Sequence, residues 1–252
     1  MTTGDTENTE KTPCIQCGTL IALNGRFCNN CGARQSAEVF NSFENKWSLL
    51  KQAALFFSID IVACCLAKFA HAFDTLSWSL FIDITMAVAA VFFFAINWTE
   101  NKTLLIWHHF SWQKLAAYAA IGMGGSFLVH YLVGWLNLVI YSKDENYFQL
   151  LKGNLFIDFL VISFTAVMPA LFEELGFRGY LLQTLLKVTD KEQAVYISAF
   201  LFAIIHMSFI SLFWLIPFAL FLSFVRIKEN TVWYGVFFHF VFNLTGCLFE
   251  LL

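Results

Sequence analysis

The sequence has few charged residues, few prolines and no basic segment. Only 13% of its 252 residues are charged and three are proline, whereas a soluble domain carries about 25% charged residues. Hydrophobic residues make up 59% of the chain, against roughly 45–50% in a soluble domain. This composition excludes an ordinary soluble domain and predicts an integral membrane protein in a lipid bilayer. The net charge of −3 and the lack of a basic stripe argue against a nucleic-acid partner.

The chain also has no apolar segment directly after the initiator Met, so we expect no cleavable signal peptide. Its first 47 residues are polar and the rest is apolar, which marks one domain boundary. Residues 1–11 are rich in Thr, Glu and Asn and predict a disordered tail. Residues 35–47 predict a linker, and residues 48–252 predict a transmembrane domain.

Four cysteines in the polar segment form two C-x-x-C-G motifs: Cys14 with Cys17, and Cys28 with Cys31. Four thiolates at this spacing predict a tetrahedral zinc site. The glycine after each pair suits a tight turn whose backbone N–H groups point at the sulfurs. Residues 12–34 resemble the small zinc ribbons that precede many prokaryotic membrane proteins. Because so short a segment cannot bury a core, we expect structural zinc to hold it together; two disulfides are the alternative.

The apolar part divides at its polar interruptions and predicts an all-α polytopic membrane protein with about seven to eight transmembrane helices. A span needs roughly 20 apolar residues, so the fourth predicted span is over-long, the fifth and sixth are short, and an eighth results if the fourth breaks at Pro169. The predicted spans are 48–70, 77–97, 115–140, 154–186, 193–208, 211–227 and 232–251.

Lysine and arginine near the helix ends predict the orientation. With the N-terminus inside, the inner loops hold Lys46, Lys51, Lys102, Lys114, Lys187, Lys191, Arg226 and Lys228, and the outer loops hold Lys143 and Lys152. This bias predicts a cytoplasmic N-terminus, and the resemblance of residues 12–34 to prokaryotic zinc ribbons implies a prokaryotic cytoplasmic membrane. A reducing compartment for the zinc-binding thiols agrees with it.

Three ionisable residues stand together inside an apolar stretch: Glu173, Glu174 and Arg178. A charge at membrane depth costs at least ~2.5–3.5 kcal/mol, so such residues predict a functional site, with mere helix packing as the alternative. On a helix, Glu174 and Arg178 form an i,i+4 pair in the favourable order, and Glu173 points about 100° away. We therefore assign the pair to architecture and Glu173 to general-base chemistry. Gly176 and Gly179 allow a neighbouring helix to approach closely.

Two later helices carry further polar groups. Phe202 and His206 are four residues apart on the fifth predicted span, and so are His239 and Asn243 on the seventh; each pair therefore shares a helix face. Glu173 and His206 are equidistant from the turn between spans four and five, which gives them equal depth in an antiparallel hairpin. We expect the carboxylate, the two imidazoles and the carboxamide to meet at one point.

The motifs E-E-x-x-x-R, F-x-x-x-H and H-x-x-x-N, in this order on late membrane helices, resemble those of the CPBP family. That family contains CAAX-processing endopeptidases, bacteriocin-processing or self-immunity proteins, and related intramembrane proteases. The resemblance covers about residues 150–251. It implies that the first Glu and the middle His activate a water and that the last His and Asn form an oxyanion hole. The catalytic residues it implies are Glu173, His206, His239 and Asn243, supported by Glu174, Arg178 and Phe202.

A zinc-dependent mechanism is the alternative, because Glu173, His206 and His239 could supply the three protein ligands of a catalytic zinc. Asn243 favours a metal-free, glutamate-type mechanism, since an amide is a poor zinc ligand but a good oxyanion donor, a contact worth ~2.7–4 kcal/mol in the barrier. The predicted substrate is a membrane-associated peptide or protein. A prenylated one is less favoured, because prenylated proteins are mainly eukaryotic and the ribbon suggests a prokaryote.

Two other classes of function compete with the protease. One is a non-catalytic binding or bacteriocin-immunity protein on the same scaffold. The other is a transporter that uses the carboxylates as a proton relay, although the sequence shows no related halves. For Asp60, Asp83 and Asp158, intramembrane carboxylates without a surrounding motif, we expect hydrogen bonds between helices, with a place in the cavity or a proton path as the alternative.

Overall fold

The computed structural model describes residues 11–14, 16–22, 28, 30–32, 37–70, 75–141 and 155–251. Most of the predicted tail, together with Lys143 and Lys152 of the predicted outer loops, lies outside these residues. The chain divides into two compact units, residues 1–49 and 50–252. Each unit has its own architecture and is described by itself.

The first unit contains a two-stranded antiparallel sheet. Strand β1 (Lys11–Pro13) pairs with β2 (Leu20–Ala22), with Pro13 opposite Leu20. The strands flank the first cysteine motif, and β1 begins one residue before the predicted ribbon. An isolated two-stranded hairpin is only marginally stable in water, so this unit needs a further source of stability.

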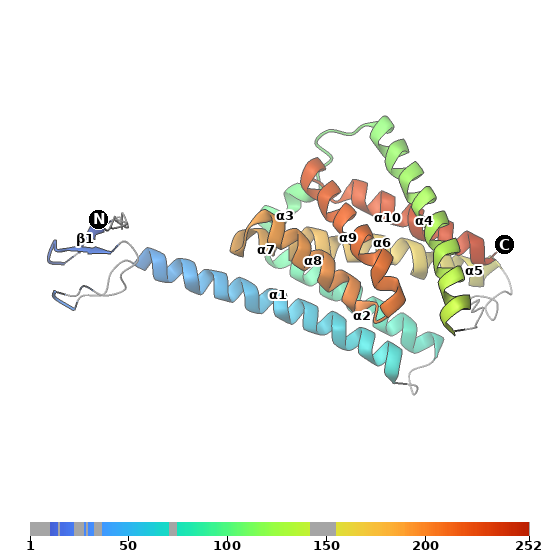
Figure 1. Ribbon diagram of the computed structural model, residues 1–252, viewed down its shortest axis with the longest axis horizontal. Helices are drawn as coiled ribbons and strands as arrows, with labels where there is room; N and C mark the ends of the chain where they lie inside the picture. The colour runs from blue at the N-terminus through green and yellow to red at the C-terminus, as the bar shows by residue number, and fades with distance from the viewer. Residues whose placement is uncertain are drawn as a thin grey trace, which may run out of the picture. The chain divides into compact units, whose positions relative to one another are not determined.

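The second unit is helical, as predicted, and its helices lie side by side (Figure 1). It begins within α1 (Ala37–Phe69), which starts inside the predicted linker, and continues with α2 (Leu76–Ile96). Two short turns follow, α3 (Trp98–Asn101) and the 3-10 helix η2 (Lys102–Leu105), before α4 (Trp112–Tyr141). Among the described residues, five helical stretches are long and apolar enough to cross a membrane: 45–69, 77–96, 112–140, 158–188 and 209–229.

The fourth stretch is one continuous helix from Leu155 to Val188 that contains two π-helical segments. Its parts are α5 (Leu155–Ile162), η3 (Ser163–Val167), α6 (Met168–Glu173), η4 (Glu174–Leu181) and α7 (Leu182–Val188), with η3 and η4 being π-helical. The helix does not break at Pro169, so the eighth span considered above does not arise there. Pro169 follows the π-helical segment η3 directly, inside the continuous helix, where it cannot donate a backbone N–H to the preceding turn.

The last three helices differ in length. Helix α8 (Lys191–Ile205) has 15 residues, which gives about 22 Å, less than the ~30 Å of a bilayer core. Helix α9 (Phe209–Glu229) has 21 residues, so the prediction that the sixth span is short is wrong: the helix includes Phe209 and runs past residue 227. Helix α10 (Trp233–Leu251) ends the described chain.

Aromatic side chains and two glycines pack the core of the second unit. The ring centroid of Phe56 in α1 lies 5.5 Å from Phe93 in α2 and 5.6 Å from Phe177 in η4. A Cβ at Gly176 would lie 2.7 Å from Phe56, and one at Gly179 would lie 2.8 Å from Phe94. Both glycines therefore permit the close helix approach that the sequence predicted.

Most of the lysine- and arginine-bearing loops assigned to the inner side meet at one end of the bundle. Lys114 of α4 forms an ion pair with Glu229 of α9 at 2.6 Å, and Lys187 of α7 pairs with Glu100 of α3. The Thr231 hydroxyl donates a hydrogen bond to the Leu104 carbonyl at 2.9 Å. These loops therefore share one side, as the predicted topology requires.

Candidate active site and four-cysteine metal centre

The four cysteines of the first unit form a compact cluster. The Sγ atoms of Cys14, Cys17, Cys28 and Cys31 all lie within 4.8 Å of one another, with Cys14–Cys31 at 3.7 Å and Cys17–Cys28 at 3.6 Å. Sulfurs at about 2.3 Å from one tetrahedral zinc are about 3.8 Å apart, whereas a disulfide is about 2.05 Å long. The cluster therefore fits one four-thiolate metal ion and not the two-disulfide alternative.

Local hydrogen bonds lower the pKa of two of the four thiols, Cys14 and Cys17. Gly18 and Gly32 both have φ of 72°, which suits glycine, and each N–H donates to the carbonyl of the first cysteine of its motif at 2.9 Å. The N–H of Cys17 donates to the Cys14 sulfur at 3.5 Å, and this bond lowers the pKa of Cys14. The Thr19 hydroxyl lowers the pKa of Cys17 to about 5. Metal binding requires the deprotonated form.

In the second unit, one cavity of about 280 Å³ is lined by every residue predicted to be catalytic. Glu173 comes from α6, His206 follows α8, and His239 and Asn243 lie on α10. The cavity thus collects residues separated by up to about seventy positions in the sequence. Its remaining walls are mainly apolar or aromatic: Phe164, Thr165, Pro169, Phe202, Trp214, Leu215 and Phe218.

Glu174 is fully buried and makes two contacts. Its Oε1 accepts a hydrogen bond from Arg178 Nη1 at 2.9 Å and lies 3.0 Å from His239 Nδ1. A carboxylate accepts but does not donate, so His239 carries its proton on Nδ1. The ion pair with Arg178 was predicted, but the contact with His239 was not. Glu174 therefore orients a cavity residue as well as pairing with Arg178.

Phe202 packs against the ion pair of Glu174 and Arg178. The Arg178 guanidinium carbon lies 4.2 Å from the centre of the Phe202 ring, a cation–π contact, and Arg178 Nη2 also donates to the Ala219 carbonyl at 3.3 Å. Both Arg178 and Phe202 are fully buried. The F-x-x-x-H motif thus pairs a residue that packs the buried charge with His206, which faces the cavity.

His206 lies just after the end of α8 and is its C-cap. Its Nδ1 lies 3.0 Å from the Phe202 carbonyl oxygen, an acceptor, so Nδ1 carries the proton and Nε2 keeps a lone pair. The following residue, Met207, has φ of 49°, and Ser208 then caps α9 through the N–H of Ser211. This tight turn replaces the polar loop that the sequence lacks.

Asn243 is positioned by the π-helical segment η3. Its Nδ2 donates to the Thr165 carbonyl oxygen at 3.1 Å, and the amide has a second N–H for another acceptor. The Ser198 hydroxyl similarly donates to the Phe177 carbonyl of η4 at 3.4 Å. Side chains from α8 and α10 thus satisfy carbonyls on the helix that holds both π segments, which are frequent at functional sites.

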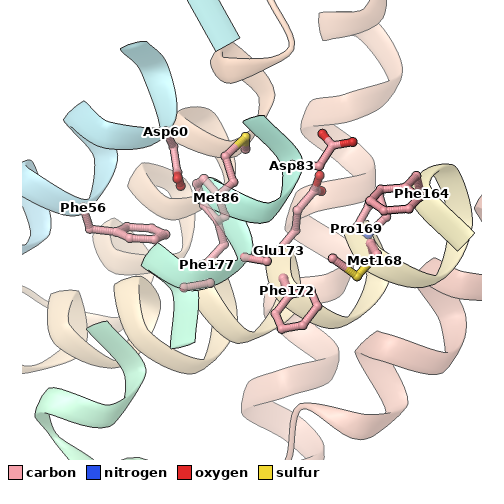
Figure 2. A pocket seen from close by; sticks show the side chains of 12 residues that line it. Phe56, Asp60, Asp83, Met86, Phe164, Met168, Pro169, Phe172, Glu173 and Phe177 are labelled. Atoms are coloured by element: carbon pink, nitrogen blue, oxygen red, sulfur yellow. The ribbon is translucent and has the colours of Figure 1, made fainter. Parts of the chain in front are cut away.

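Glu173 lies between two cavities. Its Oε2 is 3.9 Å from His239 Nε2, and its side chain also lines a second, smaller cavity with Asp60 and Asp83 (Figure 2). Asp60 Oδ1 is buried and has no hydrogen-bond partner among the described residues. The expectation that Asp60 hydrogen-bonds between helices is therefore wrong for this oxygen. The helical-wheel argument distinguished the roles of Glu173 and Glu174. Nothing in the composition predicted the second cavity.

Part of the chain matches a known protein family. Residues 155–245 match the family model described as type II CAAX prenyl endopeptidase Rce1-like. The matched segment runs from α5 into α10 and contains all three motifs, so the relationship to the CPBP family predicted from those motifs is confirmed. No curated protein and no solved structure matches the chain.

Proposed function

We propose that the protein is an intramembrane endopeptidase of the glutamate type, acting on a membrane-associated peptide or protein. The observation that carries the proposal is the cavity shared by Glu173, His206, His239 and Asn243. A carboxylate, two imidazoles and a carboxamide around one space can activate a water and stabilise an oxyanion. The matched family model supports the same reaction class.

Glu173 and His206 would activate the water. His206 Nδ1 is occupied by the Phe202 carbonyl, so Nε2 accepts a hydrogen bond from a water placed beside Glu173. Glu173 takes one proton as the water oxygen bonds to the peptide carbonyl carbon. It then gives that proton to the amide nitrogen as the C–N bond breaks, leaving a carboxyl and an amine.

His239 and Asn243 would stabilise the tetrahedral intermediate. The contact between His239 Nδ1 and Glu174 at 3.0 Å requires a second proton on Nε2 before the ring can donate to the oxyanion. The buried Glu174 carboxylate stabilises the resulting imidazolium, as the aspartate of a catalytic triad does. Asn243 donates its second N–H, while the Thr165 carbonyl holds the first.

The same geometry bears on the zinc-dependent alternative. Among the described residues, the four cysteines are the one group whose ligand atoms lie within 4.8 Å of one another; Glu173, His206 and His239 are not gathered as closely. With Nδ1 of His239 held by Glu174, only its Nε2 could bind a metal. A zinc-binding histidine makes the same contact, so it is the wider spacing of Glu173, His206 and His239 that favours water activation by Glu173 and His206.

The four-cysteine cluster supports a second part of the proposal. We infer that it holds one structural zinc ion, because its sulfur spacings match a tetrahedral zinc site. A reducing environment keeps such thiols available, which favours a cytoplasmic N-terminus. Inductively coupled plasma mass spectrometry on the reduced, purified protein should find about one zinc per chain, and a protein without zinc would refute this assignment.

The decisive experiment compares the membrane peptidome of cells carrying wild-type protein with that of cells carrying Glu173→Gln. Glutamine keeps the shape and removes the base, so peptide N-termini that depend on Glu173 should disappear, with a rate loss of about 10²–10⁴. A farnesylated peptide ending in CAAX, tested separately, would reveal a prenylated substrate. Full activity of Glu173→Gln would end the protease proposal in favour of a non-catalytic binding or immunity protein.

A chelation assay separates the two mechanisms. It should use Cys14→Ser/Cys17→Ser protein, so that loss of zinc from the ribbon does not confuse the result. Hydrolysis that survives strong chelation agrees with the glutamate mechanism. Hydrolysis that stops, and returns only with added zinc, keeps the protease and replaces the mechanism by the zinc-dependent one.

A further inference from the structure

The smaller cavity beside Glu173, here called the acidic chamber, is separate from the catalytic cavity but shares a wall with it. Its volume is about 50 Å³, and its polar lining consists of Asp60 on α1, Asp83 on α2 and Glu173 on α6. Phe164, Pro169 and Glu173 line both cavities. Glu173 can therefore be approached from either space.

Asp60 is the unusual residue of the acidic chamber. It is only 2% exposed, and its Oδ1 has no hydrogen-bond partner among the described residues. In Figure 2 Asp60, Asp83 and Glu173 line the pocket, and the carboxyl group of Glu173 points toward Asp83. Leaving a buried acceptor without a partner costs roughly 1–3 kcal/mol. A ligand that donates hydrogen bonds would remove this cost.

The size and shape of the acidic chamber select that ligand. A cavity holds one water when about 10–15 Å³ is open to the centre of a water-sized sphere. The acidic chamber, with about 50 Å³ of this volume, therefore holds a few waters. The three carboxyl groups that line the chamber supply hydrogen-bond acceptors of the kind that an internal water requires. A bound metal ion fits less well, because these carboxylates are not gathered as the cysteines are. Glu174, Arg178 and Cys64 are the other ionisable groups close enough to interact with the chamber's carboxylates.

We propose that the acidic chamber stores the waters that are consumed at Glu173, and that Asp60 is a positioning residue that holds them. The inference rests on the proposed hydrolase function. A peptide bound among Glu173, His206 and Asn243 fills the catalytic cavity and displaces its water, yet each turnover consumes one water molecule. The chamber supplies that molecule from the other side of Glu173, which takes its proton as described above.

Radiolytic hydroxyl-radical labelling of the full-length protein in lipid nanodiscs tests for the stored water. Radicals form where water is held, so Met86 and Met168, which line the chamber, should be oxidised in the wild-type protein. In Asp60→Leu, which is apolar and of similar size, this oxidation should fall severalfold. Asp60→Asn keeps a polar group and should retain it. Thr85→Val is the matched control, because Thr85 lines a separate apolar groove between α1 and α2.

The same four proteins are then scored for the rate at which Glu173-dependent peptide N-termini appear, and for melting temperature. We expect about a tenfold loss of rate in Asp60→Leu, recovery of most of the rate in Asp60→Asn, and no change in Thr85→Val. The melting temperature of Asp60→Leu should stay level or rise, because an unpaired buried acceptor is removed. If Asp60 had a purely structural role, the melting temperature of Asp60→Leu would fall.

Three results would overturn the proposal. The first is wild-type protein without oxidation at Met86 and Met168, or with oxidation that Asp60→Leu leaves unchanged. The second is a dry chamber in Asp60→Leu with an unchanged rate, since the water would then not be the one consumed. The third is wild-type protein that produces no Glu173-dependent N-termini. This result would refute the proposed hydrolase function, and the acidic chamber would then have no reaction to supply with water, whatever the labelling shows.

Discussion

The two units of the chain build their polar sites in opposite ways. In the ribbon, four sulfurs come from two motifs less than twenty residues apart, and their distances are set by local turns. In the membrane unit, Glu174 meets His239 across 65 residues of sequence. Among the described residues of the ribbon, the buried cluster consists of Cys14, Ile21 and Cys28, whereas the membrane site sits on a much larger core rich in aromatic side chains.

This contrast indicates where the stability of each unit lies. The ribbon depends on its ligand, because a small sheet and three buried side chains cannot offset the entropy of ordering it. The membrane unit depends on packing, and its buried charges are held by one another. Removing metal-binding thiolates should therefore unfold the ribbon completely. Removing a buried charge should only weaken the membrane unit, residues 50–252.

The largest effect should follow removal of two thiolates. Cys14→Ser/Cys17→Ser should lose the metal and unfold residues 12–34, because structural zinc contributes about 10–16 kcal/mol to such modules. The membrane helices should stay assembled, since packing holds them. Metal content and limited proteolysis of the ribbon would measure the loss, and the melting temperature of the helical unit is the control. A matching collapse of the helices would show that the two units are not independent.

The next effect distinguishes the two adjacent glutamates. Glu174→Gln should lower the stability of the membrane unit by about 3–5 kcal/mol, because it leaves Arg178 buried without its partner. Hydrolysis should fall as well, since His239 loses the carboxylate that orients it. Glu173→Gln is the matched control: the ion-pair contact of Glu173 with His239 Nε2 is long, at 3.9 Å, so removing this carboxylate should leave the melting temperature nearly level. Equal melting temperatures for the two variants would contradict this division.

A smaller effect concerns the helix contact behind the site. Gly179→Ala places a Cβ about 2.8 Å from the Phe94 ring, a distance that forces the ring to move. Overpacking of this kind typically costs about 1–3 kcal/mol. Thermal unfolding in nanodiscs would measure it. Gly124→Ala, where a Cβ meets nothing within 4 Å, should leave stability unchanged; a similar loss in both variants would point to a general effect of alanine.

The smallest effect should come from Ser198→Ala. Ser198 is buried and donates one long hydrogen bond, 3.4 Å, to the Phe177 carbonyl of η4. Such bonds within membrane proteins average about 0.6 kcal/mol, so the melting temperature should move only slightly. A loss as large as that of Glu174→Gln would mean that this hydroxyl stabilises the π segment as much as the ion pair does.

Much of the architecture could be predicted because its signals are local. Runs of apolar residues gave most of the helices, and the C-x-x-C-G spacing gave the four-cysteine cluster. The errors arose where length depends on neighbours. Helix α9 extends past residue 227 to Glu229, where Glu229 pairs with Lys114 of α4, and the preceding turn is bonded to α7 through Arg226 and Gln183. No pattern within the segment itself reveals those partners.

The composition of the site could also be predicted, but not its connections. Four-residue spacings placed Phe202 with His206 and His239 with Asn243 on shared faces, and the structure gathers the polar members in one cavity. The contact of His239 with Glu174 and the support of Asn243 by Thr165 depend on how α10 packs against the helix that holds the π segments. The π geometry has no period that the sequence reveals, so these contacts required the structure.

The π-helical segment η4 also fixes a rotational phase along its helix. A π turn holds one residue more than an α turn at nearly the same length, so η4 acts as an insertion absorbed within the helix. If the segment became α-helical with no residue removed, everything on one side of it would rotate by about 100° relative to the other and move by about 1.5 Å along the axis. The chain would still cross the membrane, but Glu173 and the face that meets α8 would no longer point in compatible directions. Deleting one residue from η4 at the same time would cancel that rotation.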